Sequence, residues 1–387
     1  MNPLGLYIHW PFCLSKCPYC DFNSHVREKI DHKRWGDALL KELEHAAQNQ
    51  KNRHLVSVFF GGGTPSLMEP ETVAILLEKT KSFFHTTEDM EVTLEANPST
   101  VEAGRFKGFF DAGINRLSLG IQSLNDEALV FLGRRHSARD ALKALEVATT
   151  YFSRFSFDLI YARPHQTPAS WKTELLDALT FAKGHLSLYQ LTIEPQTVFA
   201  TRALRGEKMA LEDDLAALLY EMTEELMQDA GLDAYEVSNY AQPSQECRHN
   251  LLYWNFENYI GIGPGAHGRI SSKEKKWATL RYKAPETWLE AVETQGHGLQ
   301  TSQLLSPLER LHELTLMGLR LTKGLEVKRI LEETGLELHQ AYPHQHLDRL
   351  EKEGLLERVD THLIPTFEGR LRLNALTAYL LNNLGDK

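Results

Sequence analysis

The amino-acid sequence predicts an α/β fold. We expect a partial (β/α)6 barrel of six parallel strands with helices between them, and a small C-terminal winged-helix-like α+β domain. Through the first two-thirds of the chain, short β-type runs alternate with amphipathic runs of helix length. Parallel strands need a crossover of about that length, whereas a hairpin needs only a short turn, so the alternation predicts βαβ units. After about residue 235 the alternation stops, which predicts a change of architecture there.

The order of the elements follows from these runs. The six expected strands are residues 4–8, 55–60, 91–96, 117–121, 155–160 and 186–193. The expected helices between them are residues 34–48, 71–84, 100–112, 138–149 and 168–182. Ligands of such barrels gather at the carboxyl ends of the strands, so residues at these ends are the first candidates for a site.

The change after residue 235 divides the chain into three expected regions. Residues 1–235 form the core barrel, 236–305 a loop-rich segment that is least regular over 238–268, and 306–387 the C-terminal domain. In the last region we expect a helix over 307–321, two further helices, a strand pair at 355–359 and 362–365, and a closing helix. This region has 11 Lys and Arg against 13 Asp and Glu, so we expect a packing or docking role and no nucleic-acid partner.

Composition excludes several classes of function. The 387-residue chain has a net charge of −10 with both signs interspersed, which argues against binding driven by phosphate neutralisation. No stretch is long and apolar enough to span a bilayer, and the start of the chain does not resemble a secretion signal. Three of the four cysteines lie in one loop, a usage typical of metal sites in a reducing compartment. We therefore expect a cytoplasmic protein.

The three clustered cysteines are Cys13, Cys17 and Cys20, in a C-x3-C-x2-C loop directly after the first expected strand. Three thiolates at this spacing can hold three irons of a [4Fe-4S] cluster and leave the fourth iron open. A disulfide would use two of the cysteines and leave the third thiol unpaired. A zinc site usually needs a fourth ligand, for which His9 or His25 is available. The spacing favours the cluster.

The cysteine loop and the Gly-Gly-Thr-Pro element at 62–65 together resemble the radical SAM superfamily. Members of this superfamily bind S-adenosylmethionine (SAM) at the open iron. The resemblance implies that the backbone of Gly62, Gly63 and Thr64 receives the methionine amino group. It also implies that Tyr7 and Tyr19 flank the cluster.

Four further SAM contacts are implied by the same resemblance, at or just beyond expected strand ends. Glu95 lies in an E-x-N-P setting, Gln122 would bind ribose hydroxyls, and Asp158 would contact ribose or adenine. Arg134 would clamp the SAM carboxylate, because a guanidinium can bind a carboxylate through two parallel hydrogen bonds; Arg135 beside it is the alternative.

The segment after Asp158 departs from the family pattern. Related families read D-L-I-Y-G-L-P here, whereas this chain has Ala162 and Arg163 in place of Gly and Leu. We expect an altered loop beside the adenine.

The whole chain resembles the coproporphyrinogen III oxidase-like group of radical SAM proteins, through motifs at 7–13, 235–241 and 261–268. Two functions compete within that group. One is the oxygen-independent coproporphyrinogen III dehydrogenase, which oxidatively decarboxylates two propionates. The other is that of the HemW haem chaperones, which bind haem and pass it to haemoproteins.

Three features favour the chaperone family. The dehydrogenase has Gly-Cys after the third cysteine, whereas Cys20 is followed here by Asp21 and Phe22. The dehydrogenase has a long segment ahead of its cysteine loop, and here Cys13 follows only twelve residues. Residues 249–254 read H-N-x-x-Y-W, which resembles the HemW signature.

That signature suggests a haem site. A neutral imidazole is a common ligand of haem iron, so His249 is a candidate ligand, and Tyr253 and Trp254 would stack on the macrocycle. Cys247 and His267 are competing ligands, and a hydrogen-bonding role for the His-Asn pair is the plainer alternative. The sequence leaves the choice of iron ligand open.

We therefore expect a haem chaperone with a [4Fe-4S] cluster, SAM and haem as its cargo, and haemoproteins as clients. The alternative is an oxygen-independent coproporphyrinogen III dehydrogenase. The resemblance further implies that cluster and SAM serve assembly, including a homodimer, and that delivery takes place near the inner membrane.

Overall fold

The computed structural model describes residues 3–48, 50, 53–359 and 361–385. All six expected strands are present and run side by side in the order of the chain. They are β1 (Pro3–Trp10), β4 (His54–Gly62), β5 (His85–Ala96), β6 (Arg116–Gln122), β7 (Arg154–Tyr161) and β8 (His185–Gln190), and each adjacent pair is parallel. The predicted α/β barrel core is thus confirmed.

All five expected helices between these strands are present, one of them divided in two, and two further short helices were not expected. The structure has α1 (His32–Ala47), η1 (Pro65–Leu67), α2 (Pro70–Phe83), α3 (Thr100–Ala103), α4 (Phe106–Asp111), α5 (Asp126–Phe131), α6 (Ala138–Tyr151) and α7 (Pro168–Leu179). The single helix expected over 100–112 is two short ones, because the chain turns at Gly104, whose N–H bonds to Thr100 and Glu102 carbonyls. Capping boxes at Ser137 and Thr167 fix where α6 and α7 begin.

The expectation of a loop-rich segment over 238–268 is wrong. Beyond β8 come α8 (Val198–Leu204), α9 (Asp213–Asp229), β9 (Asp233–Glu236), β10 (Asn239–Ala241), α10 (Arg248–Trp254), β11 (Asn258–Ile262), β12 (His267–Ser272), β13 (Lys275–Arg281), α11 (Pro285–Gln295) and β14 (Leu299–Leu304). The strands within 238–268 are short, so no periodicity marks them. They nevertheless extend the large sheet at both edges, and β11 lies parallel to β1.

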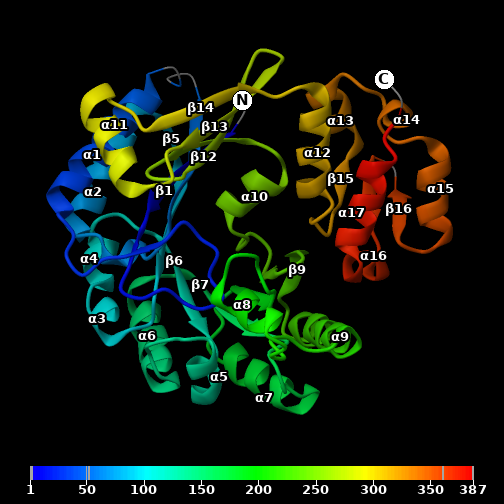
Figure 1. Cartoon of the computed structure of the whole chain (residues 1–387), viewed down its shortest axis with the longest axis horizontal. Coiled ribbons are helices and arrows are strands. Elements are labelled where there is room, and N and C mark those ends of the chain that lie inside the picture. The colour runs from blue at the N-terminus through cyan, green and yellow to red at the C-terminus, as the bar shows by residue number, and fades with distance from the viewer. Residues whose placement is uncertain (1–2, 49, 51–52, 360, 386–387) are drawn as a thin grey trace.

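Helix α10 contacts β1, β4 and β11 and lies near the middle of the molecule in Figure 1. Gly5 of β1 makes room for it, since a Cβ there would lie 2.7 Å from Leu252 and 3.2 Å from the His249 ring. A larger residue at position 5 would push α10 away from the sheet.

The C-terminal domain follows the expected winged-helix-like order in outline, but it has one more strand, three helices where two were expected between its first helix and the strand pair, and two closing helices where one was expected. Its elements are α12 (Pro307–Gly318), β15 (Leu325–Glu326), α13 (Val327–Thr334), α14 (Leu338–Ala341), α15 (His344–Lys352), β16 (Leu356–Val359), β17 (His362–Pro365), α16 (Phe367–Leu371) and α17 (Leu373–Asn382). The three strands form a separate small sheet over a core that includes Leu314, Ile330 and Tyr342. In Figure 1 this domain lies across the molecule from α1, α2 and α11.

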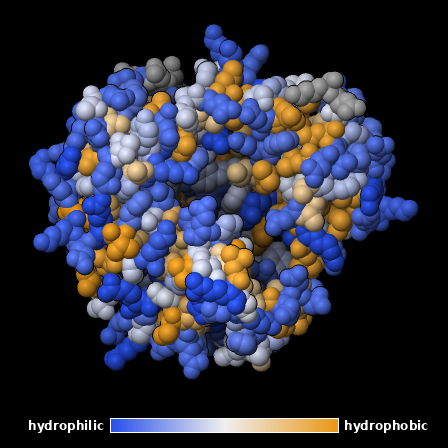
Figure 2. Space-filling model, viewed as in Figure 1, coloured by the Kyte–Doolittle hydropathy of each residue, from blue (hydrophilic) through white to orange (hydrophobic). Residues whose placement is uncertain are grey.

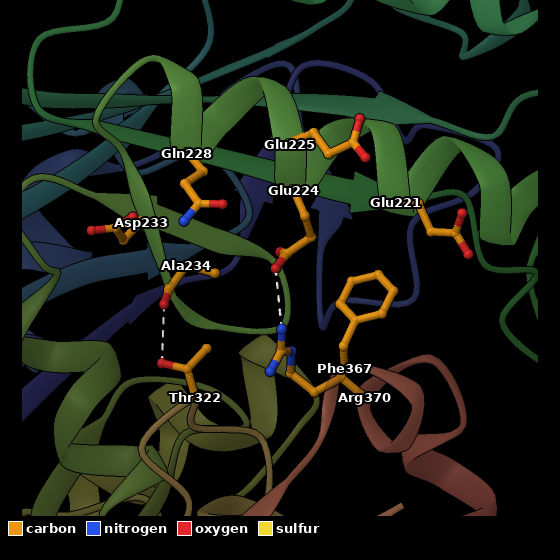
Figure 3. Close-up of a pocket in the computed structure, with 9 residues that line it drawn as sticks. All are labelled: Glu221, Glu224, Glu225, Gln228, Asp233, Ala234, Thr322, Phe367 and Arg370. Carbon is orange, nitrogen blue, oxygen red and sulfur yellow. Dashed lines mark hydrogen bonds and ion pairs between the residues drawn. The ribbon is translucent and has the colours of Figure 1, made fainter. Parts of the chain in front are cut away.

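Specific contacts attach this domain to the barrel. Thr322 donates a hydrogen bond to the Ala234 carbonyl (3.0 Å), and Arg370 of α16 pairs with Glu224 of α9 (3.3 Å), as Figure 3 shows. Arg320 pairs with the fully buried Glu236 (3.0 Å).

The face drawn in Figure 2 mixes hydrophilic and hydrophobic residues and is hollowed near its centre. Among the described residues, no helix combines the length and apolar character that crossing a membrane requires.

Candidate functional site

The cysteine loop is closed by short-range backbone bonds. The strands β2 (Phe12–Cys13) and β3 (His25–Val26) pair in parallel, and His25 N–H donates to the Pro11 carbonyl (2.7 Å). Cys20 N–H donates to the Cys17 carbonyl (3.1 Å). Cys13, Cys17 and Cys20 are all half-buried free thiols, so none is held in a disulfide.

Each of the three sulfur atoms has a polar neighbour. Thr64 Oγ1 donates to Cys13 Sγ (3.3 Å), Arg134 Nη1 donates to Cys17 Sγ (3.3 Å), and Ser24 Oγ lies 3.9 Å from Cys20 Sγ. Burial raises the pKa of the Cys13 and Cys20 thiols, and these hydroxyl groups act against the rise. Donors aimed at sulfur favour the thiolate form, which is the form that binds iron.

The sulfur atoms are not gathered around one point. No group of three or more His, Cys, Asp or Glu side chains within the described part of the chain could hold a single metal ion. A four-iron cluster does not need such a point, because each thiolate binds a different iron. The preference for a cluster over the zinc alternative rests on the cysteine spacing and on the family resemblance.

Two glycines let the end of β4 lie directly against the cysteine loop. Gly63 N–H donates to the Trp10 carbonyl (2.7 Å) and Thr64 N–H to the Phe12 carbonyl (2.8 Å). A Cβ on Gly63 would lie 2.7 Å from the Phe12 oxygen, and Gly62 has a φ of +112°. Only glycine satisfies both requirements at little cost.

Two carboxyl groups face the same space from neighbouring parts of the barrel. Burial, followed by the charge of Asp158, raises the pKa of Glu95 to about 8, while Glu95 accepts a bond from Gly62 N–H (3.2 Å). Burial raises the pKa of Asp158 to about 6, against the effects of Ser187, Arg116 and Arg134. Neither carboxyl makes an ion pair with another described residue. A cationic ligand in this space would therefore pair with them and stabilise their ionised forms.

Arg134 joins the cysteine loop to the strand ends. Its guanidinium donates to Asn97 Oδ1 (2.5 Å), the Gly120 carbonyl (2.7 Å) and Tyr19 Oη (3.4 Å), besides Cys17. Arg135 is exposed and reaches only the Leu14 carbonyl (3.5 Å). Both arginines line the cavity described below, and Arg134 is the one in contact with the cysteine loop and with the strand ends.

A cavity of about 620 Å³ connects these groups. Its wall includes all three cysteines and eight of the nine residues expected to contact SAM: Tyr19, Gly62, Gly63, Thr64, Glu95, Gln122, Arg134 and Asp158. The ninth, Tyr7, is not on the wall, and its hydroxyl instead meets His9 Nδ1 (3.1 Å). Gln122 has a φ of +72°, a strained conformation for a non-glycine residue at a ligand site.

The wall also contains residues that sequence reasoning did not select, among them Asn97, Ser118 and Tyr189. Asn97 stands in the same E-x-N-P motif as Glu95 and donates to Thr64 Oγ1 (3.2 Å). Its place in the motif was the signal that could have identified it. Ser118 and Tyr189 carry no such signal, because only the parallel pairing of β5 to β8 brings them here.

The arrangement suits a cluster with SAM. Three thiols lie at one side of the cavity, and carboxyl, guanidinium and amide groups line the space beyond them. SAM carries an ammonium, a carboxylate and a sulfonium, for which these side chains provide partners of opposite charge.

The residues expected to hold haem do not share a surface in this structure. His249 is 1% exposed, and both its ring nitrogens are hydrogen-bonded, Nδ1 with Ser57 Oγ and Nε2 with Tyr253 Oη, each at 2.8 Å. Burial lowers the pKa of His249 to about 3. Trp254 instead lies under the Arg320 guanidinium, 4.6 Å from its ring centroid. The expected stacking platform of Tyr253 and Trp254 is therefore not formed.

The reason is local. The motif forms helix α10, and neighbouring residues on a helix point in directions about 100° apart. The two competing ligands differ in access. Cys247 is fully buried, and burial raises its pKa to about 12, whereas His267 is exposed.

The two residues that depart from the family pattern after Asp158 are Ala162 and Arg163, and the structure shows where each of them lies. Ala162 has a φ of +56°, the left-handed conformation that glycine adopts more easily. Arg163 is 7% exposed, forms an ion pair with Glu174 and donates to Ser123 Oγ (2.7 Å). The arginine therefore points into the protein and pairs with a carboxylate of α7.

Comparison with known proteins agrees with this site. A sequence model of the radical SAM superfamily matches residues 7–177, and a model of the HemN C-terminal domain matches residues 305–372. The coproporphyrinogen III oxidase HemN of Escherichia coli superposes with a TM-score of 0.83, over 98% of this chain and 90% of that chain. At 24% identity this likeness shows a common fold.

Curated relatives match nearly the full chain. Radical S-adenosyl methionine domain-containing protein 1, mitochondrial, of Bos taurus is 38% identical over 99% of this chain and 88% of its own length. The heme chaperone HemW of Haemophilus influenzae is 38% identical over 98% of both chains, and that of Escherichia coli is 35% identical over 98% of this chain and 99% of its own. The chain therefore belongs to the radical SAM superfamily and, within it, to the family of the HemW haem chaperones.

Proposed function

We propose that this protein binds haem and delivers it to haemoproteins, and that it carries a [4Fe-4S] cluster and SAM. The observation that carries the proposal is the 35–38% identity to HemW haem chaperones over 98% of the chain. The cavity beside the cysteine loop supports the cofactor part, because it brings thiols and SAM-compatible side chains together.

Each cofactor has its own residues. Cys13, Cys17 and Cys20 would hold the cluster. The backbone of Gly62, Gly63 and Thr64 and the side chains of Tyr19, Glu95, Gln122, Arg134 and Asp158 would hold SAM, with Tyr7 supporting the site through His9. When bound, cluster and SAM supply the one-electron chemistry of the superfamily.

The haem contacts of the HemW signature need a change of conformation. His249 can bind iron only after its bonds to Ser57 or Tyr253 are broken and α10 has moved. We propose His249, Tyr253 and Trp254 as haem contacts of such an opened state.

We further propose a cytoplasmic location, a homodimer and peripheral association with the membrane during delivery. The bacterial HemW relatives support the location. The dimer and the membrane association rest on the family resemblance. Gel filtration of the cluster-loaded protein with and without SAM, and sedimentation with anionic vesicles, test them.

One experiment separates the chaperone from the dehydrogenase. The cluster is reconstituted anaerobically, SAM and reductant are added, and either coproporphyrinogen III or haem is supplied. Stoichiometric haem uptake without decarboxylation is expected, followed by transfer to an apo-haemoprotein. Turnover to protoporphyrinogen IX would contradict the chaperone function. The Cys17→Ser variant controls for cluster-dependent chemistry, and it should lose cluster absorbance.

The role of His249 has a separate test. The variants Ser57→Ala and Tyr253→Phe each free one ring nitrogen. If His249 binds haem in an opened state, these variants should take up haem faster than the wild type. His249→Ala should then change the axial-ligand signals in the electron paramagnetic resonance spectrum. Unchanged spectra in all three variants would exclude His249 as the ligand.

A further inference from the structure

A second cavity, of about 750 Å³, lies between the end of α1 and the strands β11 to β14. It is separate from the SAM cavity and shares no lining residue with it. Its size is within the range of cavities that bind small organic ligands and cofactors. The residues that matter here are His45, Arg53, Ile260, Ile270, Trp277 and Arg281.

The charge of this cavity is unlike that of the chain as a whole. Arg53, Lys273 and Arg281 line it, and no Asp or Glu is among its described lining residues, although the net charge of the protein is −10. By contrast, the hollow in Figure 3 is lined by several carboxylates of α9 and only one arginine. The second cavity therefore favours an anionic ligand.

Arg281 provides a specific hydrogen-bond donor for an anionic ligand. The residue is 5% exposed and its Nε lies 2.8 Å from Glu42, yet its Nη1 has no hydrogen-bond partner among the described residues. Arg53 is half-buried, and its Nη2 donates to the Ser271 carbonyl. A buried donor without an acceptor is unfavourable, and a ligand carboxylate would satisfy it.

The remaining wall includes an imidazole and combines apolar residues (Ala46, Ile260, Ile270, Trp277 and Leu299) with polar ones (Gln50, Ser271, Ser272, Thr279 and Ser302). Ile260, Ile270 and Trp277 provide a hydrophobic surface from three adjacent strands. The His45 ring lies 4.4 Å from that of His297, and burial, with smaller effects of His297 and Arg281, lowers the pKa of His45. The lowered pKa favours the neutral imidazole, which is the form that binds iron.

We propose that this cavity binds haem in the conformation seen here, with His45 on the iron, Trp277 and Ile270 against the macrocycle, and Arg53 and Arg281 on the propionates. The inference rests on the proposed function and adds a loading site that is distinct from the haem contacts proposed for the opened state. The cavity and the HemW signature lie on opposite faces of β11. Tyr259 contacts Tyr253 of α10 (4.6 Å between ring centroids), whereas its neighbour Ile260 faces the cavity. Haem can therefore load here while His249 stays buried.

The test is a titration of the full-length, cluster-loaded protein with ferric haem, followed by absorption and electron paramagnetic resonance. His45→Ala should weaken haem binding by about tenfold or more and remove the imidazole signature. Arg53→Gln should weaken it by about tenfold, since a hydrogen bond to a charged group is lost. His344→Ala, at an exposed histidine of the C-terminal domain, should bind haem like the wild type.

The outcomes separate this inference from the proposed function. Haem uptake that is unchanged in the His45, Arg53 and Trp277→Leu variants would overturn the site and leave the chaperone function standing. A wild-type protein that takes up no haem would overturn both. A second measurement needs no variant. Haem should protect His45 of the wild type from diethyl pyrocarbonate, mapped by mass spectrometry, and equal modification with and without haem would also overturn the site.

Discussion

At the residue scale, the cavity beside the cysteine loop contains two half-buried carboxyl groups, Glu95 and Asp158, that have no cationic partner among the described residues. Burial raises the pKa of Glu95 to about 8 and that of Asp158 to about 6. At neutral pH the carboxyl of Glu95 is therefore mostly protonated, whereas that of Asp158 is mostly ionised. A bound ligand with an ammonium or sulfonium group would lower both pKa values and release protons, so binding of SAM should become tighter as the pH rises.

The variant Glu95→Gln tests whether the pKa of this carboxyl is raised in the folded protein. A carboxyl whose folded pKa is raised contributes its full stability below the unfolded value near 4.5 and loses it as the pH rises to about 8. The free energy of unfolding of the wild type should therefore fall relative to that of the variant between these pH values. At pH 8 the variant should be the more stable protein. Urea titrations at several pH values measure this, with the exposed Glu88→Gln as control. Parallel curves would contradict it.

A second residue-scale feature is the buried pair Arg163–Glu174, whose members are 7% and 8% exposed. Arg163→Leu restores the residue of the related families but leaves the carboxylate of Glu174 buried without its cation. We expect a loss of about 3 kcal/mol in the free energy of unfolding. The double variant Arg163→Leu/Glu174→Leu should recover most of that loss. Thermal and urea unfolding of the three proteins provide the comparison, and a fully additive result would show that the two residues do not interact.

At the element scale, one carboxylate joins three segments that lie far apart in the chain. Glu42 of α1 accepts bonds from Gly263 N–H (2.8 Å), Trp288 Nε1 (2.8 Å) and Gly298 N–H (2.7 Å). It also lies against Arg281. Through these bonds α1 fixes the positions of β11, α11 and β14, and with them the wall of the second cavity.

Glu42→Gln should therefore loosen that edge of the sheet. The amide keeps some hydrogen bonds but leaves Arg281 buried without a counter-charge, and we expect a loss of about 3 kcal/mol. Hydrogen exchange should rise in β11 to β14 more than in β4 to β7. Glu44→Gln, at an exposed position of the same helix, is the matched control and should be near neutral. A uniform increase of exchange over the whole sheet would contradict this account.

At the scale of the whole molecule, charged contacts hold the C-terminal domain against the barrel. Arg320 pairs with the fully buried Glu236 and covers the ring of Trp254. Arg269 pairs with Glu313 through two bonds (2.7 and 2.8 Å). The Trp254 end of α10 is therefore in contact with the interface, so a movement of α10 and a movement of the domain are linked.

Arg320→Ala is the corresponding test. It leaves Glu236 buried without its cation, so we expect a loss of about 3 kcal/mol and faster proteolysis near the domain boundary. The tryptophan fluorescence should also change, because the cation over Trp254 is removed. Arg349→Ala, which breaks an exposed pair with Glu353, should cost less than about 1 kcal/mol. Equal stability losses in the two variants would argue against a specific role of Arg320.

Much of the fold and of the cofactor site was predictable from local patterns. The six parallel strands followed from the alternation of short and amphipathic runs, and the cysteine loop from the spacing of Cys13, Cys17 and Cys20. The extension of the sheet by β9 to β14 was not predictable in the same way. β9, β10 and β11 have only four, three and five residues, and β11 joins the sheet by pairing with the distant β1.

By itself, the sequence determined the family, the cluster loop and most of the SAM wall, because these depend on residues close together in the chain or at regular strand ends. The tertiary structure alone decided which polar residues are available to a ligand. His249 is hydrogen-bonded to Ser57, which lies 192 positions away in the sequence. The wall of the cavity at the end of α1 depends on the hydrogen bond from Gly298 N–H to Glu42, which lies 256 positions away. Contacts of this kind arise from the packing of whole elements, and no local pattern records them.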